Sequence, residues 1–216
     1  MKTLMKKINK KEALNLSKKN KMDFIIFVFE NEKIAPNENE IQNIYTGDAV
    51  SFDLRLNEDV IINFEKAEKN LKKTVLIGTG CKWCAPPGIY LQIVPRSGIS
   101  LNTSLKISNS PGTIEPSYRN EIKLIIDYSI LYLLVKDTQN ISFNYKDSIF
   151  VNNNTFYIKK YIKFAQAIIS TSLFYFNIYG GKPINIFYVI DKELYENWHK
   201  IFPSKRSLNG FGSTGI

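Results

Sequence analysis

Two short stretches of this chain combine a basic residue, hydroxyl groups and glycine, which is the composition of an anion-binding loop. In "VPRSGIS", Arg96 supplies a planar fork of donors, Ser97 a short hydroxyl donor, and Gly98 an open approach to the backbone. The C-terminal "RSLNGFGSTGI" follows Arg206 with glycines, a Ser-Thr pair and one aromatic residue, Phe211. Because glycine loses the most backbone entropy on ordering, this tail is interpreted either as a frayed end or as a lid that closes on an anion.

One acidic residue beside a turn is the candidate for base chemistry. In "SNSPGTIEPSYRNEI", Glu115 stands between Ile114 and Pro116 at the end of an expected strand. Such a carboxylate could orient water as a general base, or it could be a solvated turn acid, because surface carboxylates far outnumber catalytic ones. Residue type alone leaves both interpretations open.

The two cysteines, Cys81 and Cys84, have the C-x-x-C spacing. A redox dithiol would need this motif at a helix start, and a structural zinc site would need a second pair of ligands. His199 is the only histidine and no further cysteine occurs. The spacing is therefore interpreted as a coincidence on a strand.

The elements that must position these residues are short apolar runs separated by Asn, Asp, Gly and Pro. Their β-branched and aromatic residues mostly alternate with polar ones, which predicts strands at 24–30, 50–56, 59–65, 74–80, 89–95, 104–108, 121–135, 141–145, 148–152, 155–169 and 184–190. Only 191–202 is predicted as a convincing helix, with 10–20 as a marginal second. Regularly spaced strands indicate an all-β sandwich or barrel.

Composition indicates an ordinary globular chain. Of its 216 residues, 44% are hydrophobic and 23% charged, and no apolar run approaches the roughly 18 residues that span a bilayer. The first 23 residues hold eight lysines against two acids, so they carry most of the net charge of +9 and are expected to form a solvated basic arm. We expect a soluble intracellular protein, cytoplasmic or in a host cell, with no membrane and no specific nucleic-acid partner.

Taken in order, "PRSG", "NSPGTIEPSYRNEI", "KFAQ" and "RSLNGFGSTG" resemble the motifs of the trimeric dUTPases, and "DAVSFDL" is similar to the first motif of that family. The resemblance runs from about Phe24 to the C-terminus. It implies hydrolysis of dUTP to dUMP and pyrophosphate with Mg²⁺, a jelly-roll-like β-clip barrel, and a homotrimer whose subunits exchange a C-terminal lid. The implied organisation is an arm at 1–23, a β domain at 24–205 and a lid at 206–216.

The resemblance also implies a role for each matching residue. Asp53 would help to position Mg²⁺ through water, Glu115 would orient the attacking water, and Gln166 would donate to the phosphates. Tyr118 would lie under the deoxyribose, and Phe211 would stack on uracil. The implied substrate-binding set is Arg96, Ser97, Gly98, Asn109, Gly112, Ile114, Tyr118, Lys163, Arg206, Phe211, Gly212, Ser213 and Thr214.

Two departures from the family pattern concern charged residues. Glu115 stands where the family usually has Asp, and the extra methylene displaces the carboxylate by about 1 Å, a misplacement that can cost about a hundredfold in rate. Lys163 stands where the family usually has Arg, so the charge is kept but the bidentate fork is lost.

Two rival functions follow from the same residues. A dCTP deaminase shares the implied fold and has an early motif similar to "SFDLRLN", but it usually has a second Ser where this chain has Gly98. A dUTPase-like regulator would bind nucleotide with little or no hydrolysis. Its extra segments, 136–159 and 168–204, could contact a regulatory protein partner.

Overall fold

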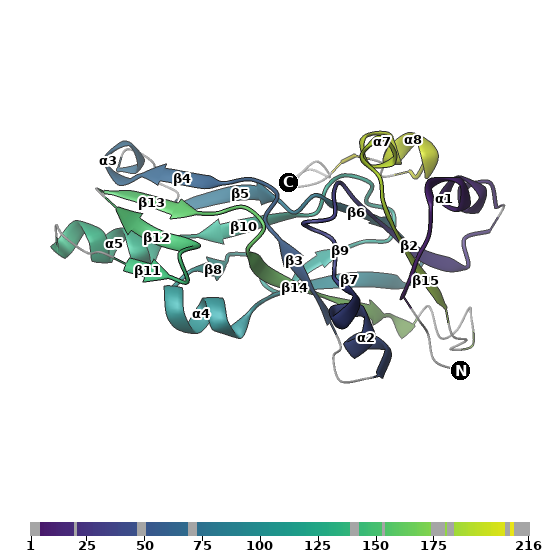
Figure 1. The fold of residues 1–216 in the computed structure, drawn as a ribbon, viewed down its shortest axis with the longest axis horizontal. Coiled ribbons are helices and arrows are strands. Elements are labelled where there is room, and N and C mark those ends of the chain that lie inside the picture. Colours follow the sequence, from purple (N-terminus) through teal and green to yellow (C-terminus); the bar gives the residue numbers. More distant parts are fainter. Residues whose placement is uncertain are drawn as a thin grey trace.

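The computed structural model describes residues 5–19, 21–46, 51–68, 73–138, 143–152, 154–173, 180, 184–205 and 208–209. Strands run through the whole molecule, and short helices lie at its ends and edges (Figure 1). The predicted all-β architecture is confirmed.

The sheet that matters most for function is antiparallel, with the strand order β3-β14-β7-β9. Its members are β3 (Ser51–Arg55), β14 (Lys163–Thr171), β7 (Ile89–Pro95) and β9 (Gly112–Ile114). Because β14 pairs with β3 on one side and with β7 on the other, its backbone groups are bonded on both edges.

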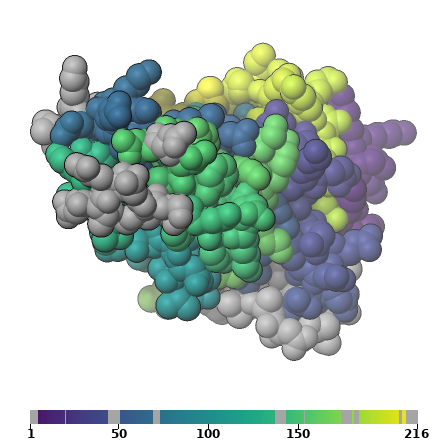
Figure 2. All heavy atoms as spheres, turned by 60° about the vertical axis from the view of Figure 1, so that its left-hand side comes forward, coloured from purple at the N-terminus to yellow at the C-terminus, as the bar shows by residue number. Residues whose placement is uncertain are grey.

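A second sheet joins the two ends of the chain in the order β1-β15-β2-β6. Both β1 (Met5–Lys7) and β2 (Phe24–Phe29) pair in parallel with β15 (Asn185–Ile190), and β6 (Cys81–Cys84) is antiparallel to β2. In Figure 2 the purple N-terminal segment accordingly lies against the yellow C-terminal segment.

The expectation of a solvated N-terminal arm is wrong for the described residues 5–19. Met5, Ile8 and Ala13 are buried, while the lysines beside them are exposed or half-buried. Helix α1 (Lys10–Ser17) begins at Asn9, whose side chain accepts from the Glu12 backbone N–H while the Glu12 carboxylate accepts from the Asn9 N–H. The prediction rested on the net charge of the segment and overlooked the apolar residues that pack it against β15.

Two further sheets carry the remaining strands. The order β11-β12-β13-β4 comprises β11 (Phe143–Tyr145), β12 (Ile149–Asn152), β13 (Thr155–Ile158) and β4 (Val60–Asn63), with the short helix α3 (Phe64–Ala67) following β4. The order β5-β10-β8 comprises β5 (Thr74–Gly78), β10 (Lys123–Asp127) and β8 (Lys106–Ile107).

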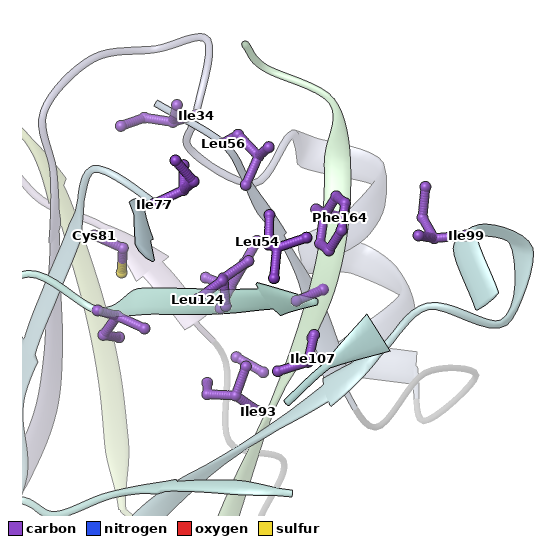
Figure 3. Close-up of a cluster of buried hydrophobic side chains, with 14 of the residues drawn as sticks. Ile34, Leu54, Leu56, Ile77, Cys81, Ile93, Ile99, Ile107, Leu124 and Phe164 are labelled. Atoms are coloured by element: carbon purple, nitrogen blue, oxygen red, sulfur yellow. The ribbon is translucent and has the colours of Figure 1, made fainter. Parts of the chain in front are cut away.

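The sheets share one large apolar core, and a smaller cluster lies behind β2. Alternate residues of β2 contribute to opposite clusters, with Phe27 in the larger and Val28 in the smaller. Figure 3 shows Leu54 from β3, Leu124 from β10 and Phe164 from β14 pointing toward one another. The central sheet is therefore anchored to its neighbours through one face.

The predicted strand 121–135 is wrong in its second half. It ends with β10, and α5 (Ser129–Thr138) follows after Asp127, whose side chain accepts from the Ser129 N–H at 2.8 Å. Leu131, Tyr132 and Val135 are buried at helical spacing. A continuous apolar run predicts a buried strand and a helix equally well, so periodicity could not decide between them.

Other boundaries also differ from the prediction. The expected strand 155–169 is split into β13 and β14 by a turn in which Tyr161 has a φ of 68°. Helices α2 (Glu38–Thr46) and α4 (Ser97–Thr103) were not predicted. The predicted helix 191–202 is confirmed as α7 (Lys192–Glu196) and α8 (Trp198–Ile201), and the marginal one as α1.

Within the described part of the chain, none of the helices has the length and apolar character needed to cross a bilayer.

Candidate active site

The central sheet aligns segments that lie far apart in the sequence. Gln166 on β14 is opposite Asp53 on β3 and opposite Val94 on β7. On the other side of β7, Gly112 of β9 is opposite Ile93. Residues of four of the predicted motifs are therefore neighbours in one sheet.

A bulge in β14 brings Lys163 and Gln166 to the same face of the sheet. Residues three apart on a regular strand point to opposite faces, yet the register with β3 shifts between Lys163 and Ala165, and both Phe164 and Ala165 are buried. Lys163 consequently emerges on the same side as Gln166, away from the core.

Asp53 lies between two cations on this face. Its Oδ1 is 2.9 Å from Arg96 Nε, and its Oδ2 is 3.1 Å from Lys163 Nζ. The Arg96 guanidinium also donates to the Lys163 carbonyl at 3.2 Å. Asp53 is buried, whereas the Arg96 and Lys163 side chains each keep 35% of their surface exposed. Both cations can therefore meet an anion from solvent.

Asp53 Oδ1 fits a contact with metal-bound water. It is buried and accepts no hydrogen bond within the described residues, although Arg96 Nε is close to it. Such an oxygen has lone pairs left for a water of hydration. The same part of the chain holds no group of three or more His, Cys, Asp or Glu side chains that could enclose a metal ion. A carboxylate oxygen of this kind suits Mg²⁺ that is held mainly by phosphate oxygens and water.

Glu40 belongs to the same charge cluster. It lies on helix α2, which was not predicted and which packs over β3. Its carboxylate lies 2.5 Å from Lys163 Nζ and accepts from Arg55 at 2.9 and 3.0 Å. The Asn37 backbone N–H also donates to it, at 2.8 Å. Burial alone would raise the pKa of Glu40, but the hydrogen bonds from Lys163, Asn37 and Arg55 outweigh burial and lower it to about 2.

The predicted anion-binding stretch at residues 96–98 lies at the start of helix α4. Arg96 precedes the helix, Ser97 is exposed at its first position, and Gly98 follows. A side chain on Gly98 would bring its Cβ to 3.3 Å from the Tyr145 hydroxyl of β11. The lack of a side chain at Gly98 therefore leaves room for a hydroxyl from the hairpin that follows α5.

The hairpin that carries the predicted substrate-binding residues Asn109, Gly112 and Ile114 precedes and includes β9. Gly112 is buried, and a Cβ there would lie 3.3 Å from Asn109 Nδ2 and 3.7 Å from Ile93 Cβ. Glycine thus lets the exposed Asn109 side chain lie close over the hairpin backbone.

The predicted base and sugar-binding residues follow β9. Glu115 is exposed, and its carbonyl accepts from the Tyr118 N–H at 3.1 Å. Tyr118 is only 5% exposed, and its hydroxyl donates to the Glu121 carbonyl at 3.1 Å. The hydroxyl is thus engaged within the chain, and contact with a sugar would have to come from the ring.

A single chain does not bring Glu115 to the charge cluster. Ile114 is opposite Leu91, so Glu115 lies beside Tyr90 of β7. Asp53 is in line with Val94, which is four residues farther along β7. At about 3.3 Å per residue and about 4.8 Å per strand, the backbones of Glu115 and Asp53 are roughly 19 Å apart. The predicted residues therefore form two separate groups, one at each edge of the sheet.

The C-terminal segment lies along the loop that follows Glu115. The buried Arg119 donates to the Phe202 carbonyl at 2.6 Å, and Ser204 Oγ donates to the Ser117 carbonyl at 2.5 Å. The predicted lid residues come next and lie outside the described residues: Arg206, Phe211, Gly212, Ser213 and Thr214.

Both cysteines are buried on β6, with Cys81 in the larger apolar cluster and Cys84 in the smaller. Burial raises the pKa of the Cys81 thiol well above its usual value and that of Cys84 to about 12. Neither thiol is ionised near neutral pH, so neither is placed as a nucleophile.

Comparison with known proteins supports the family resemblance. A family model described as dUTPase matches residues 37–129. A deoxyuridine 5'-triphosphate nucleotidohydrolase of Nautilia profundicola is 32% identical over 171 residues, which cover 79% of this chain and 87% of that protein. The corresponding protein of Clostridium acetobutylicum is 32% identical over 155 residues, covering 71% and 79%. The chain belongs to the dUTPase family.

A solved dUTPase structure supports the fold. A mutant of the phage 80alpha dUTPase has a TM-score of 0.50 at 18% identity and covers 71% of this chain and 91% of that one. The dUTPase family model ends at residue 129, before Lys163 and Gln166. These two residues are included in the candidate dUTPase site on structural grounds, because β14 lies between β3 and β7.

Sequence reasoning missed two members of this dUTPase cluster, Glu40 and Arg55. The spacing of Asn37 and Glu40 is a helix-start signal, because an N-cap Asn and an acidic residue three positions later satisfy each other's backbone N–H groups. Both bonds are present, at 2.9 and 2.8 Å. The signal predicts the helix, but not the partners of Glu40 across the chain.

Glu40→Gln should lower the free energy of unfolding by about 2 kcal/mol at pH 7, because Arg55 and Lys163 lose a buried counter-charge. The folded-state pKa of about 2 lies below the ordinary 4.5, so this stabilisation is complete above pH 4.5 and disappears as the pH falls to about 2. Urea unfolding of both proteins at pH 7, 4 and 3 measures it. A difference independent of pH would contradict the assigned ion pairs.

Proposed function

We propose that this chain hydrolyses dUTP to dUMP and pyrophosphate. The observation that carries the proposal is the pair of half-exposed cations, Arg96 and Lys163, beside Gln166 on one face of a sheet in a dUTPase-family chain. A triphosphate supplies the concentrated negative charge that such a face requires.

The phosphate chain lies against the Asp53 edge of the sheet. Arg96 offers a fork of donors, Ser97 an exposed hydroxyl, and Gln166 an amide. Lys163 adds a point charge at the start of β14. These donors stabilise the charge that develops on the phosphates as the P–O bond breaks.

Glu115 is the general base. Its exposed carboxylate accepts a proton from water while the water oxygen bonds to the α-phosphorus. The bond between the α-phosphorus and the bridging oxygen breaks, and pyrophosphate leaves with those electrons. Glu is longer than the usual Asp, so the base acts from a backbone position about 1 Å farther from the water.

The hairpin before Glu115 selects the nucleoside. Backbone groups of Gly112 and Ile114, with the Asn109 side chain above them, present a fixed donor and acceptor pattern to uracil. The Tyr118 ring packs beneath the deoxyribose, where a 2′-hydroxyl would not fit.

Mg²⁺ is the proposed cofactor, and Asp53 Oδ1 would accept a hydrogen bond from its water shell. When bound to the triphosphate, the ion supplies charge neutralisation and orientation of the phosphates. Arg96 and Lys163 each form an ion pair with Asp53, so the chain holds this carboxylate in place.

A homotrimer completes the site. Because Glu115 and Asp53 lie at opposite edges of one sheet, a base from one subunit must meet a phosphate cluster from another. The lid residues then close over the phosphates and uracil. The segment before them is held on the Glu115 loop by Arg119, which supports a lid that starts near the base.

Replacement of the base should abolish turnover. Glu115→Gln is expected to lower pyrophosphate release from dUTP by about a thousandfold because the amide cannot take the proton. Glu115→Asp keeps the carboxylate but withdraws it by about 1 Å, so a smaller loss of up to about a hundredfold is expected. Glu58→Gln, an exposed carboxylate outside the cluster, is the control.

The same assay with dUTP, dTTP, dCTP and UTP tests selectivity. Selective turnover of dUTP is expected. Tight dUTP binding in calorimetry without any turnover would reject the hydrolase and favour the regulator, and ammonia release from dCTP would favour the deaminase.

Mixed trimers should recover activity. Glu115→Gln and Arg96→Ala are each expected to be inactive, but trimers formed from equal amounts of both chains should recover about a quarter of wild-type activity, because some sites then combine an intact base with an intact phosphate cluster. Light scattering should give a mass of about 75 kDa, three chains of 24.9 kDa. Recovery of no activity in confirmed mixed trimers would mean that base and cluster belong to one chain.

Asp53→Asn should raise the Mg²⁺ concentration needed for half-maximal turnover at saturating dUTP by about tenfold, since the amide oxygen is a weaker acceptor for metal-bound water. Asp23→Asn, an exposed acid near α1, should leave the Mg²⁺ requirement unchanged. An unaltered requirement in Asp53→Asn would remove Asp53 from the metal site.

A further inference from the structure

Lys163 needs more positioning than an arginine at the same place. An ammonium on a flexible four-carbon stem has no fixed plane, whereas a guanidinium can lie flat against a carboxylate with two parallel bonds. One carboxylate, Asp53, is not enough to hold Lys163 in a single orientation, because Asp53 also lies against Arg96.

Glu40 supplies a second carboxylate that is itself held firmly. Arg55 NH2 bonds both of its oxygens, and the Asn37 N–H bonds Oε2, so the carboxylate plane is fixed before Lys163 is considered. The Glu40 and Arg55 side chains are only 13% and 8% exposed, so this pair is shielded from solvent. Arg55 is further held by the Ala35 carbonyl at 3.3 Å.

The Lys163 ammonium lies between the two carboxylates. Glu40 Oε1 is 2.5 Å away on one side and Asp53 Oδ2 is 3.1 Å away on the other. An ammonium has three N–H donors, so two are directed to carboxylates and one is left for a phosphate oxygen. The Lys163 side chain keeps 35% of its surface exposed, so a phosphate can approach it from solvent.

We propose that Glu40 is a positioning residue for substrate binding, which orients Lys163 so that its remaining N–H meets the phosphate chain. Glu40 and Lys163 together then do what an arginine fork does alone. The inference rests on the proposed function of the Asp53 face as the phosphate site, and it adds helix α2 to the parts of the chain that determine affinity for the nucleotide.

Calorimetry with a non-hydrolysable imido analogue of dUTP tests this without turnover. Glu40→Gln should weaken binding about tenfold, as expected for losing the orientation of one charged hydrogen bond, and should raise KM for dUTP while kcat changes less than about twofold. Glu38→Gln, in the same first turn of α2 but exposed, should change neither. Glu40→Asp, which keeps the charge and withdraws it by one methylene, provides a milder variant should Glu40→Gln fold poorly.

A double-mutant cycle separates positioning from general loss of structure. In a Lys163→Ala background, Glu40→Gln should cause no further loss of affinity, because the group that it orients is gone. Lys163→Arg in the Glu40→Gln background should restore affinity to within about threefold of the wild type, since the planar fork holds itself on Asp53. Neither result is expected from a purely structural role.

Additive losses in the cycle, or unchanged affinity in Glu40→Gln, would overturn the inference. Tighter binding in Glu40→Gln would also overturn it, because Glu40 would then compete with the phosphates for Lys163. Failure of the proposed function looks different: the wild type would bind the analogue, with the predicted dependence on Glu40, but would not release pyrophosphate from dUTP.

Discussion

The pairing of β14 with a strand on each side is the constraint on which the site depends. One face of β14 is packed into the core through Ala165 and Ala167, so the polar residues of β14 can emerge only on the other face. The same alternation applies to β3, where Phe52 and Leu54 are buried in the core and Asp53 lies between them. Core packing on one side of the sheet thus sets the distances between charges on the other side.

Those charges are balanced in a way that suits a binding site for a polyanion. Two carboxylates, Asp53 and Glu40, stand against three cations, Arg55 on β3, Arg96 just after β7 and Lys163 on β14, so one positive charge is left over at the surface. Buried ion pairs are expensive to form unless all partners are well placed, and the capping of α2 and the fork of Arg55 provide that placement. The cluster is therefore preorganised, which would reduce the reorganisation needed to bind a phosphate chain there.

The register of β9 separates recognition from phosphate binding. The hairpin that would read uracil and the base that follows it lie at the β9 edge, whereas the charge cluster lies across β7 and β14 toward β3. A rigid sheet cannot fold these edges together, so completion by another subunit is the simplest way to assemble one site. Arg119 connects the loop that follows Glu115 to the C-terminal segment through its hydrogen bond to the Phe202 carbonyl.

The sequence by itself determined the local features: strands where apolar and polar residues alternate, a basic residue followed by a hydroxyl at Arg96 and Ser97, and a carboxylate after Ile114, because these depend on residue type and short-range spacing. It failed where a property depends on contacts across the chain. The apolar run after Asp127 forms a helix because its apolar side chains are buried in the core at helical spacing. Only the bulge at Phe164 directs Lys163 and Gln166 to one face. Glu40 entered the cluster because α2 folds over β3, and no spacing rule relates it to Lys163.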